Sequence, residues 1–196
     1  MIAPESISRA VFIFVCFGWL AYPIVAYFSR KPTQATEQKR DRRSVAGIAL
    51  QGGAFAIVWS IRRPWSTPIV QTGNVVNIIL AVVTILLLIG ALWITGAAIR
   101  SLGKQWSFAA RVVTGHQLVT AGPYRLVRHP IYTGMLGMLL ATGLAASHWA
   151  AFIAALMVFL LGTSIRIRAE ERLLREAFGR AYDEYAERVP AIIPFG

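Results

Sequence analysis

The segment GHQLVTAGPYRLVRHPIYTG, residues 115–134, gathers side chains that could do chemistry. Pro130 is expected in the first turn of an apolar helix, where its missing N–H costs nothing. Arg128 and His129 would then lie at the helix N-terminus, where free N–H groups and the positive end of the macrodipole favour an anion or a ligand carboxylate. The alternative is structural: Arg128 reaches lipid headgroups and His129 caps the helix.

A second candidate segment follows the last apolar stretch. Arg166 precedes Glu170 by four residues, so on a helix the two side chains share one face, one turn apart. Six of the nine acidic residues fall between Glu170 and Glu187, which is unusual beside a membrane. The alternative is that these acids only form ordinary pairs with the interleaved arginines.

Several familiar chemistries are absent from the sequence. It contains no GxxxxGK[ST], GxGxxG after a strand, HExxH or GxSxG pattern. Its three histidines, His116, His129 and His148, are 13 and 19 residues apart, so no metal site is predicted. The single cysteine, Cys16, excludes an intramolecular disulfide and a CxxC redox pair.

The elements that position these residues must lie in a membrane. The chain is 56% apolar and 15% charged, with a mean hydropathy of +0.57, which excludes a water-soluble domain. Uncharged stretches cover residues 10–29, 44–61, 64–99 and 131–165. The last would be about 52 Å long as one helix, against a hydrocarbon core of roughly 30 Å. It must therefore turn, and residues 146–149 are the expected turn of a helical hairpin.

Five spans follow, and the basic residues orient them. Segments before span 1, between spans 2 and 3, and between spans 4 and 5 hold 3 Lys and Arg, against 17 in the alternate segments. Positive residues are retained in the cytoplasm, so the N-terminus is predicted outside and the C-terminus inside. The net charge of +11 thus mostly reflects the orientation of the chain in the membrane, and no nucleic-acid partner is expected. The first span, without a cleavage pattern, is expected to be a retained anchor.

The cytoplasmic parts are predicted to be a connector at residues 100–130 and a helix at residues 166–188. In the helix, apolar residues recur every three or four positions. That face must pack on protein or lie among lipid headgroups. The fold class is therefore all-α, an integral membrane protein of about five transmembrane helices with this connector and C-terminal helix.

The C-terminal half resembles a known family. The order LGKQWS (102–107), the 115–134 segment, a long hydrophobic hairpin and RIRAEERLLREAFGRAYDEYAERVPAIIPF (166–195) is similar to the isoprenylcysteine carboxyl methyltransferases. They belong to a wider group of membrane methyltransferases that includes phospholipid N-methyltransferases. The length suits one domain over residues 1–196, with three of the predicted spans in 1–99. The resemblance covers roughly the C-terminal half and implies that 100–196 is the cofactor-binding and catalytic half.

The resemblance also implies a site for S-adenosyl-L-methionine. Its residues would be His116, Gln117, Leu118, Val119, Tyr124, His129, Pro130, Ile131, Tyr132 and Glu170. Apolar and aromatic walls suit the adenine, a carboxylate suits the methionyl ammonium, and donors at the RHP helix start suit the methionyl carboxylate. Only the family register selects Glu170 over Glu171, and Tyr124 and Tyr132 could instead be interfacial belt residues.

Two positions complete the implied site. Arg166 matches a substrate-contacting arginine and, with Glu170, is the predicted catalytic pair. Ala109 stands where the family has a glutamine, so Gln105 or Arg111 would have to substitute.

The expected activity is methyl transfer to a lipophilic acceptor at the bilayer. The first candidate acceptor is the carboxylate of a prenylcysteine-like substrate. This carboxylate is ionised at neutral pH, so its methylation needs no general base. Phospholipid N-methylation and small-thiol S-methylation are alternatives. An NADPH-dependent sterol-type reductase and a non-enzymatic scaffold are alternatives of another class. Glycines at 134, 137, 143 and 162 could frame sideways entry of the acceptor between spans 4 and 5, or serve packing alone.

Overall fold

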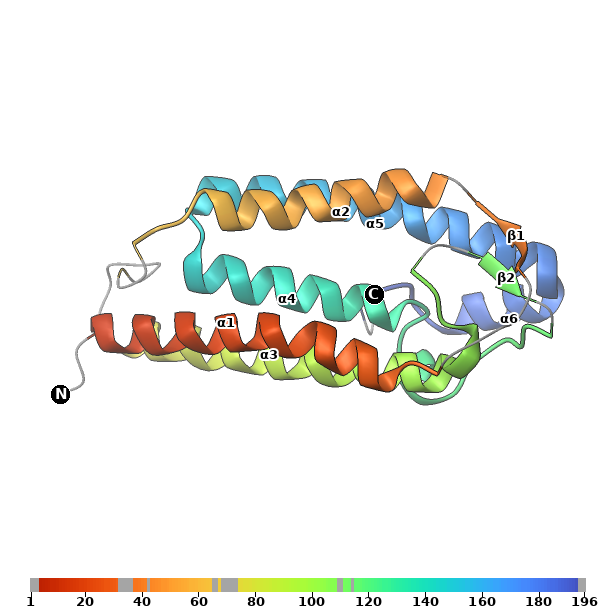
Figure 1. Cartoon of the computed structure of the whole chain (residues 1–196), viewed down its shortest axis with the longest axis horizontal. Helices are drawn as coiled ribbons and strands as arrows, with labels where there is room; N and C mark the ends of the chain where they lie inside the picture. The colour runs from red at the N-terminus through yellow and green to blue at the C-terminus, as the bar shows by residue number, and fades with distance from the viewer. Residues whose placement is uncertain are drawn as a thin grey trace.

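Five long helices run side by side and form the body of the molecule (Figure 1). This computed structural model describes residues 4–31, 37–41, 43–64, 67, 74–108, 111–113 and 115–193. The long helices are α1 (Pro4–Ser29), α2 (Arg43–Ser60), α3 (Asn74–Leu102), α4 (Pro130–Ala146) and α5 (Trp149–Phe178). The shorter elements are α6 (Arg180–Arg188), the 3₁₀ turns Gly103–Gln105 and Gly122–Arg125, and the strands β1 (Glu37–Arg40) and β2 (Arg111–Val113).

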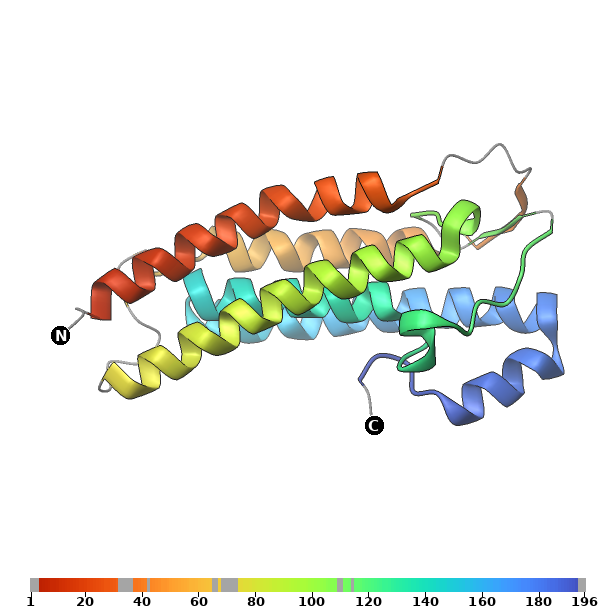
Figure 2. The same cartoon turned by 90° about the horizontal axis from the view of Figure 1, so that it is seen from below.

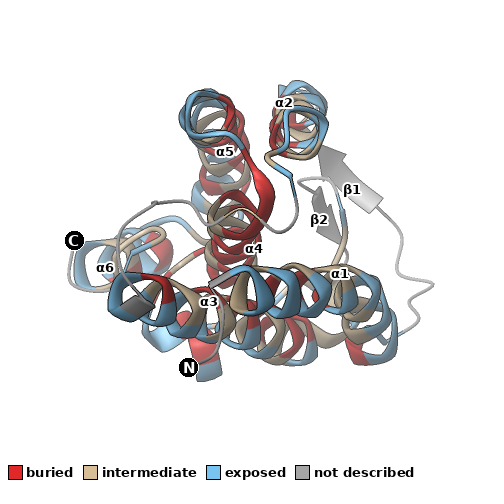
Figure 3. Cartoon of the chain, turned by 90° about the vertical axis from the view of Figure 1, so that its left-hand side faces the viewer, coloured by how far each residue is buried: buried red, intermediate tan, exposed pale blue. Residues whose placement is uncertain are grey.

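The long helices carry the marks of a membrane protein. Three of them, α1, α3 and α5, include segments long and apolar enough to cross a bilayer, and α4 is a shorter apolar helix. Large apolar side chains such as Phe17, Leu86 and Leu161 are exposed along these three helices, a pattern that marks contact with lipid. Buried residues gather along α4, in the middle of the bundle (Figure 3). The predicted α-helical, polytopic membrane fold is confirmed, and the short β1–β2 pair is an addition that the sequence did not predict.

Successive helices run back and forth, so that the connections meet at two ends of the bundle. The antiparallel strands β1 and β2 lie at one end together with α6 (Figures 1 and 2). The start of α1 and the turn between α4 and α5 lie at the other end. This alternation matches the order of the five predicted spans.

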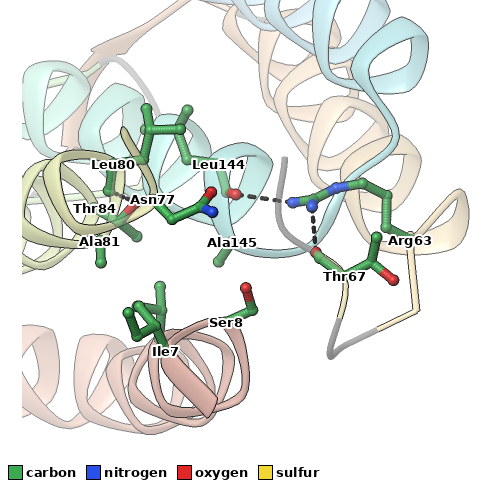
Figure 4. Close-up of a pocket in the computed structure, with 11 residues that line it drawn as sticks. Ile7, Ser8, Arg63, Thr67, Asn77, Leu80, Ala81, Thr84, Leu144 and Ala145 are labelled. Carbon is green, nitrogen blue, oxygen red and sulfur yellow. Dashed lines mark hydrogen bonds between the residues drawn. The ribbon is translucent and has the colours of Figure 1, made fainter. Parts of the chain in front are cut away.

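The predicted hairpin turn is confirmed, and Arg63 holds it. α4 ends at Ala146 and α5 begins at Trp149. The Arg63 guanidinium donates hydrogen bonds to the carbonyl oxygens of Leu144 at 2.9 Å, Ser147 at 2.8 Å and Thr67 at 2.6 Å. Figure 4 shows Arg63 reaching across to Leu144 and Thr67. Because the last carbonyls of a helix lack intrahelical partners, this cation caps the C-terminus of α4.

The predicted helix over residues 166–188 is wrong as a separate, continuous element. α5 runs without a break through Arg166 and Glu170 to Phe178, so the end of span 5 and the acidic segment are one helix. Gly179, with a φ of 51°, then ends it, and α6 turns back beneath it (Figure 2). A left-handed φ is easy for glycine, which permits the reversal. Tyr185 of α6 donates a hydrogen bond to the carbonyl of Tyr124 at 2.7 Å, so the amphipathic face packs on protein.

Glycines allow two close helix approaches. A Cβ on Gly47 of α2 would lie 2.6 Å from the carbonyl oxygen of Gly162 in α5. A Cβ on Gly134 of α4 would lie 3.0 Å from the carbonyl oxygen of Ala91 in α3. These glycines therefore serve packing of the hairpin against α2 and α3, which is the second of the two predicted roles.

Candidate active site

A cavity of about 410 Å³ lies among the helices near the end that carries α6. All five long helices contribute to its wall. The lining combines charged and polar side chains with a large apolar surface. Seven of the predicted site residues line it: His116, Tyr124, His129, Ile131, Tyr132, Arg166 and Glu170.

Glu170 is the carboxylate of the cavity wall. Its carboxylate accepts a hydrogen bond from the Tyr132 hydroxyl and lies 3.3 Å from Nδ1 of His129. The His129 ring, which is 6% exposed, stacks on the Tyr132 ring with 5.6 Å between centroids. Tyr132 and Tyr124 are both buried at the cavity, so neither ring is exposed as a residue of an interfacial belt would be.

Glu171, the neighbouring acid, is directed elsewhere. Its Oε1 accepts hydrogen bonds from Arg128 at 2.8 and 3.0 Å, and its Oε2 accepts one from Arg175 at 3.2 Å. Arg128 also donates to the carbonyl of Ala186 in α6 at 2.8 Å. Glu171 and Arg128 thus tie α5, α6 and the start of α4 together, while Glu170 faces the cavity.

His129 bridges the two acids. Its Nε2 lies 3.3 Å from Glu171, opposite the contact with Glu170. Burial alone would lower the pKa of His129, but the hydrogen bonds and charges of Glu170 and Glu171 raise it above the ordinary value. When the imidazole is protonated, its charge lies between the two carboxylates and balances part of the acidic charge in this cluster.

The start of α4 differs from the expected anion site. Pro130 occupies the first helical turn, as predicted. However, the backbone N–H of Arg128 donates to the carbonyl of Pro190 at 2.8 Å, and that of His129 donates to Ala191 at 2.9 Å. The returning C-terminal segment therefore occupies two donors that were expected to be free for a ligand carboxylate. Arg128 binds Glu171 and α6 rather than reaching outward to headgroups, and the His129 side chain makes no capping hydrogen bond, so the structural alternative also differs from what is seen.

Arg166 is fixed above an aromatic ring by a buried polar chain. Its Nη1 donates to Oε1 of Gln51 at 2.9 Å, and Nε2 of Gln51 donates to Oγ1 of Thr163 at 2.8 Å. The guanidinium lies 4.7 Å from the Tyr132 ring centroid and 3.9 Å from Glu170. Arg166 is 8% exposed, and among the described residues its Nε has no hydrogen-bond partner. Arg166 and Glu170 are thus brought together as predicted.

His116 forms another part of the wall. Its ring lies 5.8 Å from that of Phe178, and its buried Nδ1 has no hydrogen-bond partner within the described residues. Burial lowers the pKa of His116. The other four predicted cofactor residues lie outside the lining: Gln117 is exposed, Leu118 and Val119 are half-buried, and Pro130 is buried.

Comparison with known proteins places this geometry in a family. The family described as phospholipid methyltransferase matches residues 79–181, which is more than half of the chain. The chain belongs to the phospholipid methyltransferase family. The resemblance to membrane methyltransferases found in the sequence is thereby confirmed, and membership implies a methyl donor.

Relatives of this chain are named for different functions. A probable protein-S-isoprenylcysteine O-methyltransferase of Oryza sativa subsp. indica is 37% identical over 109 residues, covering 52% of this chain and 57% of its own. A cobalt-zinc-cadmium resistance protein of Cupriavidus metallidurans is 35% identical over 50% of this chain and 46% of its own. A Delta(14)-sterol reductase of Mus musculus is 40% identical over 42% of this chain and 20% of its own. The chain spans about half the length of the first relative.

The family region begins within α3, yet α1 and α2 also build the site. Sequence reasoning missed their contribution, because these helices carry no family motif. The available signal was Gln51, a polar residue within an uncharged stretch. Gln105 lines the cavity and accepts a hydrogen bond from the Gln117 backbone N–H. Ala109 and the side chain of Arg111 lie outside the described residues. The missed lining residues of α1 to α3 are Tyr22, Ala26, Ile48, Gln51, Gly52, Phe55, Thr95, Ile99 and Leu102.

Proposed function

We propose that this chain transfers a methyl group from S-adenosyl-L-methionine to the carboxylate of a prenylcysteine-like acceptor at the membrane. The observation that carries the proposal is one cavity that joins the charged cluster of Glu170, His129 and Arg166 to an apolar interior. A polar cofactor and a lipophilic acceptor need these two surroundings side by side. Family membership supports the reaction class, and the name of the Oryza relative supports this acceptor.

The wall of the cavity fits the cofactor. Glu170 would hold the methionyl ammonium, and Tyr124 and Tyr132 would contact the adenine. His116 supports this fit, because its buried Nδ1 lacks a partner among the described side chains and a bound polar group could supply one. When bound, S-adenosyl-L-methionine supplies a methyl group on a positively charged sulfur. The remaining proposed contacts are Gln117, Leu118, Val119, His129, Pro130 and Ile131.

Arg166 would receive the acceptor. Its guanidinium is a fixed charge, and an acceptor carboxylate pairs with such a group readily. Gln51 and the Tyr132 ring hold the guanidinium in place, so orientation would supply much of the rate. No side chain needs to remove a proton, because a carboxylate is already ionised at neutral pH. Burial of the cluster keeps water from competing as a nucleophile.

The apolar lining would receive the lipophilic chain. Ile48 and Phe55 come from α2, Ile99 from α3 and Met135 from α4. The acceptor would therefore lie among α1 to α4. The α4–α5 hairpin, whose glycines contact other helices, would serve as a support.

The site is proposed to face the cytoplasm. The basic residues divide as 3 against 17 between the alternate segments, and the positive-inside rule then places the N-terminus outside and the C-terminus with the site inside. The lipid bilayer is the proposed surrounding of the five long helices.

The test is methyl transfer by purified protein in detergent, with S-adenosyl-L-methionine labelled in the methyl group. An S-farnesylcysteine derivative should yield a methyl ester, which alkali hydrolyses to labelled methanol. Calorimetry should detect S-adenosylhomocysteine binding and no NADPH binding. NADPH binding with sterol reduction would support the reductase alternative, and binding of neither molecule would support a scaffold.

A phospholipid amine is the second candidate acceptor, because the matching family is described by that substrate. Its product would be an N-methyl group that resists alkali. Arg166 argues against a cationic amine in the same place, since like charges repel. Labelled, alkali-stable lipid would reverse the order of the two candidates, and an alkali-stable thioether from a small thiol would put S-methylation first.

A further inference from the structure

The apolar part of the cavity ends at a defined level inside the bundle. On α2 the lining residues are Ile48, Gln51, Gly52 and Phe55, which share one face at helical spacing. On α4 the lining runs from Ile131 through Tyr132 to Met135. One turn deeper, Val58 of α2 and Leu139 of α4 are fully buried against protein. Phe55 and Met135 therefore form the floor of the described cavity.

Phe55 is held in this floor by other aromatic rings. The Trp19 ring of α1 meets it edge to face, with centroids 5.1 Å apart and an interplanar angle of 87°. The Phe159 ring of α5 lies 5.9 Å away on an edge contact. Aromatic pairs in these geometries are favourable beyond the apolar area that they bury. The Phe55 ring thus has partners on α1 and α5.

Trp19 in turn is anchored by a polar contact. Its Nε1 donates a hydrogen bond of 2.9 Å to Oγ1 of Thr142 in α4, and Thr142 donates to the carbonyl of Met138 at 2.7 Å. Trp19 also meets Trp59 of α2 edge to face at 5.8 Å. A hydrogen bond inside an apolar bundle fixes the direction of a side chain, because an unsatisfied N–H there is costly. The floor is thus a braced structure.

We propose that this floor, formed by Phe55 and braced by Trp19, determines the longest apolar chain that an acceptor can carry. The inference rests on the proposed function, in which the acceptor carboxylate pairs with Arg166. Gln51 contacts Arg166, and Phe55 lies four residues further along α2, about 6 Å deeper. A chain that enters from the Arg166 level therefore meets the Phe55 ring, and a longer chain must bend or leave the cavity.

Two substitutions on α2 should move the limit in opposite directions. Phe55→Ala removes the ring and deepens the cavity towards Trp19. Gly52→Leu fills the cavity above the floor. Gly52 lines the cavity, and a Cβ there would meet no described atom within 4 Å, so the substitution creates no clash at the Cβ position. Phe17→Ala is the matched control, because Phe17 is 64% exposed on α1 and is not among the lining residues.

The first measurement compares acceptors with the same carboxylate head and isoprenoid chains of increasing length. The ratio of kcat/KM for the geranyl to the dimethylallyl acceptor should rise about tenfold in Phe55→Ala and fall about tenfold in Gly52→Leu, because these short chains differ at the depth of the floor. That range is typical when one hydrophobic unit is accommodated or rejected. Phe17→Ala should keep the wild-type ratio. Thr142→Val, which releases Trp19, should flatten the dependence on chain length.

A second measurement reads the floor without methyl transfer, through binding of straight-chain carboxylic acids of increasing length to the same variants. If the wild-type protein transfers methyl groups and the dependence on chain length is unchanged in both α2 variants, the role of the floor is overturned and the proposed function stands. No transfer to any prenyl acceptor, with binding profiles that shift in opposite directions, would overturn the proposed function and support the floor. Unchanged binding profiles without transfer would overturn both.

Discussion

Glu170 and Glu171 are adjacent in sequence but have different partners. Glu170 contacts His129 and Tyr132 at the cavity wall, whereas Glu171 is bound by Arg128 and Arg175. Helix geometry separates neighbouring side chains by about 100°, so only one of the two acids can face the cavity. The family register selected Glu170, and the surroundings of the two acids give that selection a physical basis.

Exchanging each acid for its amide should separate binding from stability. Glu170→Gln should weaken S-adenosylhomocysteine binding by about 1.5 to 3 kcal/mol, the range for a charge-assisted hydrogen bond. Glu171→Gln should chiefly lower the unfolding temperature, because Arg128 and Arg175 lose their acid. Calorimetry and thermal unfolding in detergent test both variants. A larger loss of affinity in Glu171→Gln would move the cofactor contact by one residue.

Arg166 should serve the acceptor rather than the cofactor. Arg166→Ala is expected to abolish methyl transfer to a prenylcysteine-like carboxylate while S-adenosylhomocysteine affinity stays within about threefold, roughly 0.65 kcal/mol. Gln51→Leu keeps the charge of Arg166 but removes the amide that holds its guanidinium. This variant should therefore raise the KM for the acceptor more than the KM for the cofactor. If Arg166→Ala loses methyl transfer and S-adenosylhomocysteine affinity together, Arg166 belongs to the cofactor site or serves the fold. Undiminished transfer to an amine would favour the phospholipid alternative.

His129 should make stability depend on pH. Its pKa is raised in the folded protein by Glu170 and Glu171 against the effect of burial. Its contribution is therefore fully present below the unfolded-state pKa of about 6.5 and is lost as pH rises through the folded-state pKa. The difference in unfolding free energy between wild type and His129→Gln should be largest near pH 6 and shrink at alkaline pH. A difference that is constant with pH would show that His129 contributes only packing.

At the scale of the elements, the features that depend on local sequence pattern were predicted, and those that depend on long-range contacts were not. Uncharged stretches gave five helices in the right places, and the length limit of a span gave the turn at residues 146–149. The reversal at Gly179 rests on a glycine that the sequence contains, but the return of Pro190 to the start of α4 depends on contacts between distant segments. A single sequence contains no signal for such contacts. For the same reason it could not place Gln51 of α2 against Arg166.

The hairpin turn offers a test at this scale. Arg63 donates to carbonyls at the end of α4, whereas the neighbouring Arg62 side chain is exposed. Arg63→Ala should lower the unfolding free energy by about 1.5 to 3 kcal/mol, as expected for hydrogen bonds from a charged group. Arg62→Ala should have little effect. Thermal unfolding in detergent measures both, and S-adenosylhomocysteine affinity should not change because Arg63 is at the opposite end from the site. Equal effects of the two variants would remove the capping role.

At the scale of the whole molecule, the site and the basic segments share one end. The cavity lies near α6, β1 and β2, and the connections at this end belong to the segments that hold 17 of the 20 Lys and Arg residues. Basic residues near span ends are retained in the cytoplasm during insertion. The orientation therefore decides which compartment supplies the polar cofactor.

A reporter at each terminus tests this orientation. The C-terminus should be accessible from the cytoplasm and the N-terminus from outside, because five helices in alternating directions put the two ends of the chain on opposite sides. Single cysteines added at the termini, in a chain with Cys16→Ser, can be labelled with an impermeant thiol reagent in intact and in opened cells. Labelling of the N-terminal cysteine alone in intact cells is the expected result. Labelling of both termini from one side would require an even number of crossings, and labelling of only the C-terminus in intact cells would reverse the orientation and place the cofactor site outside.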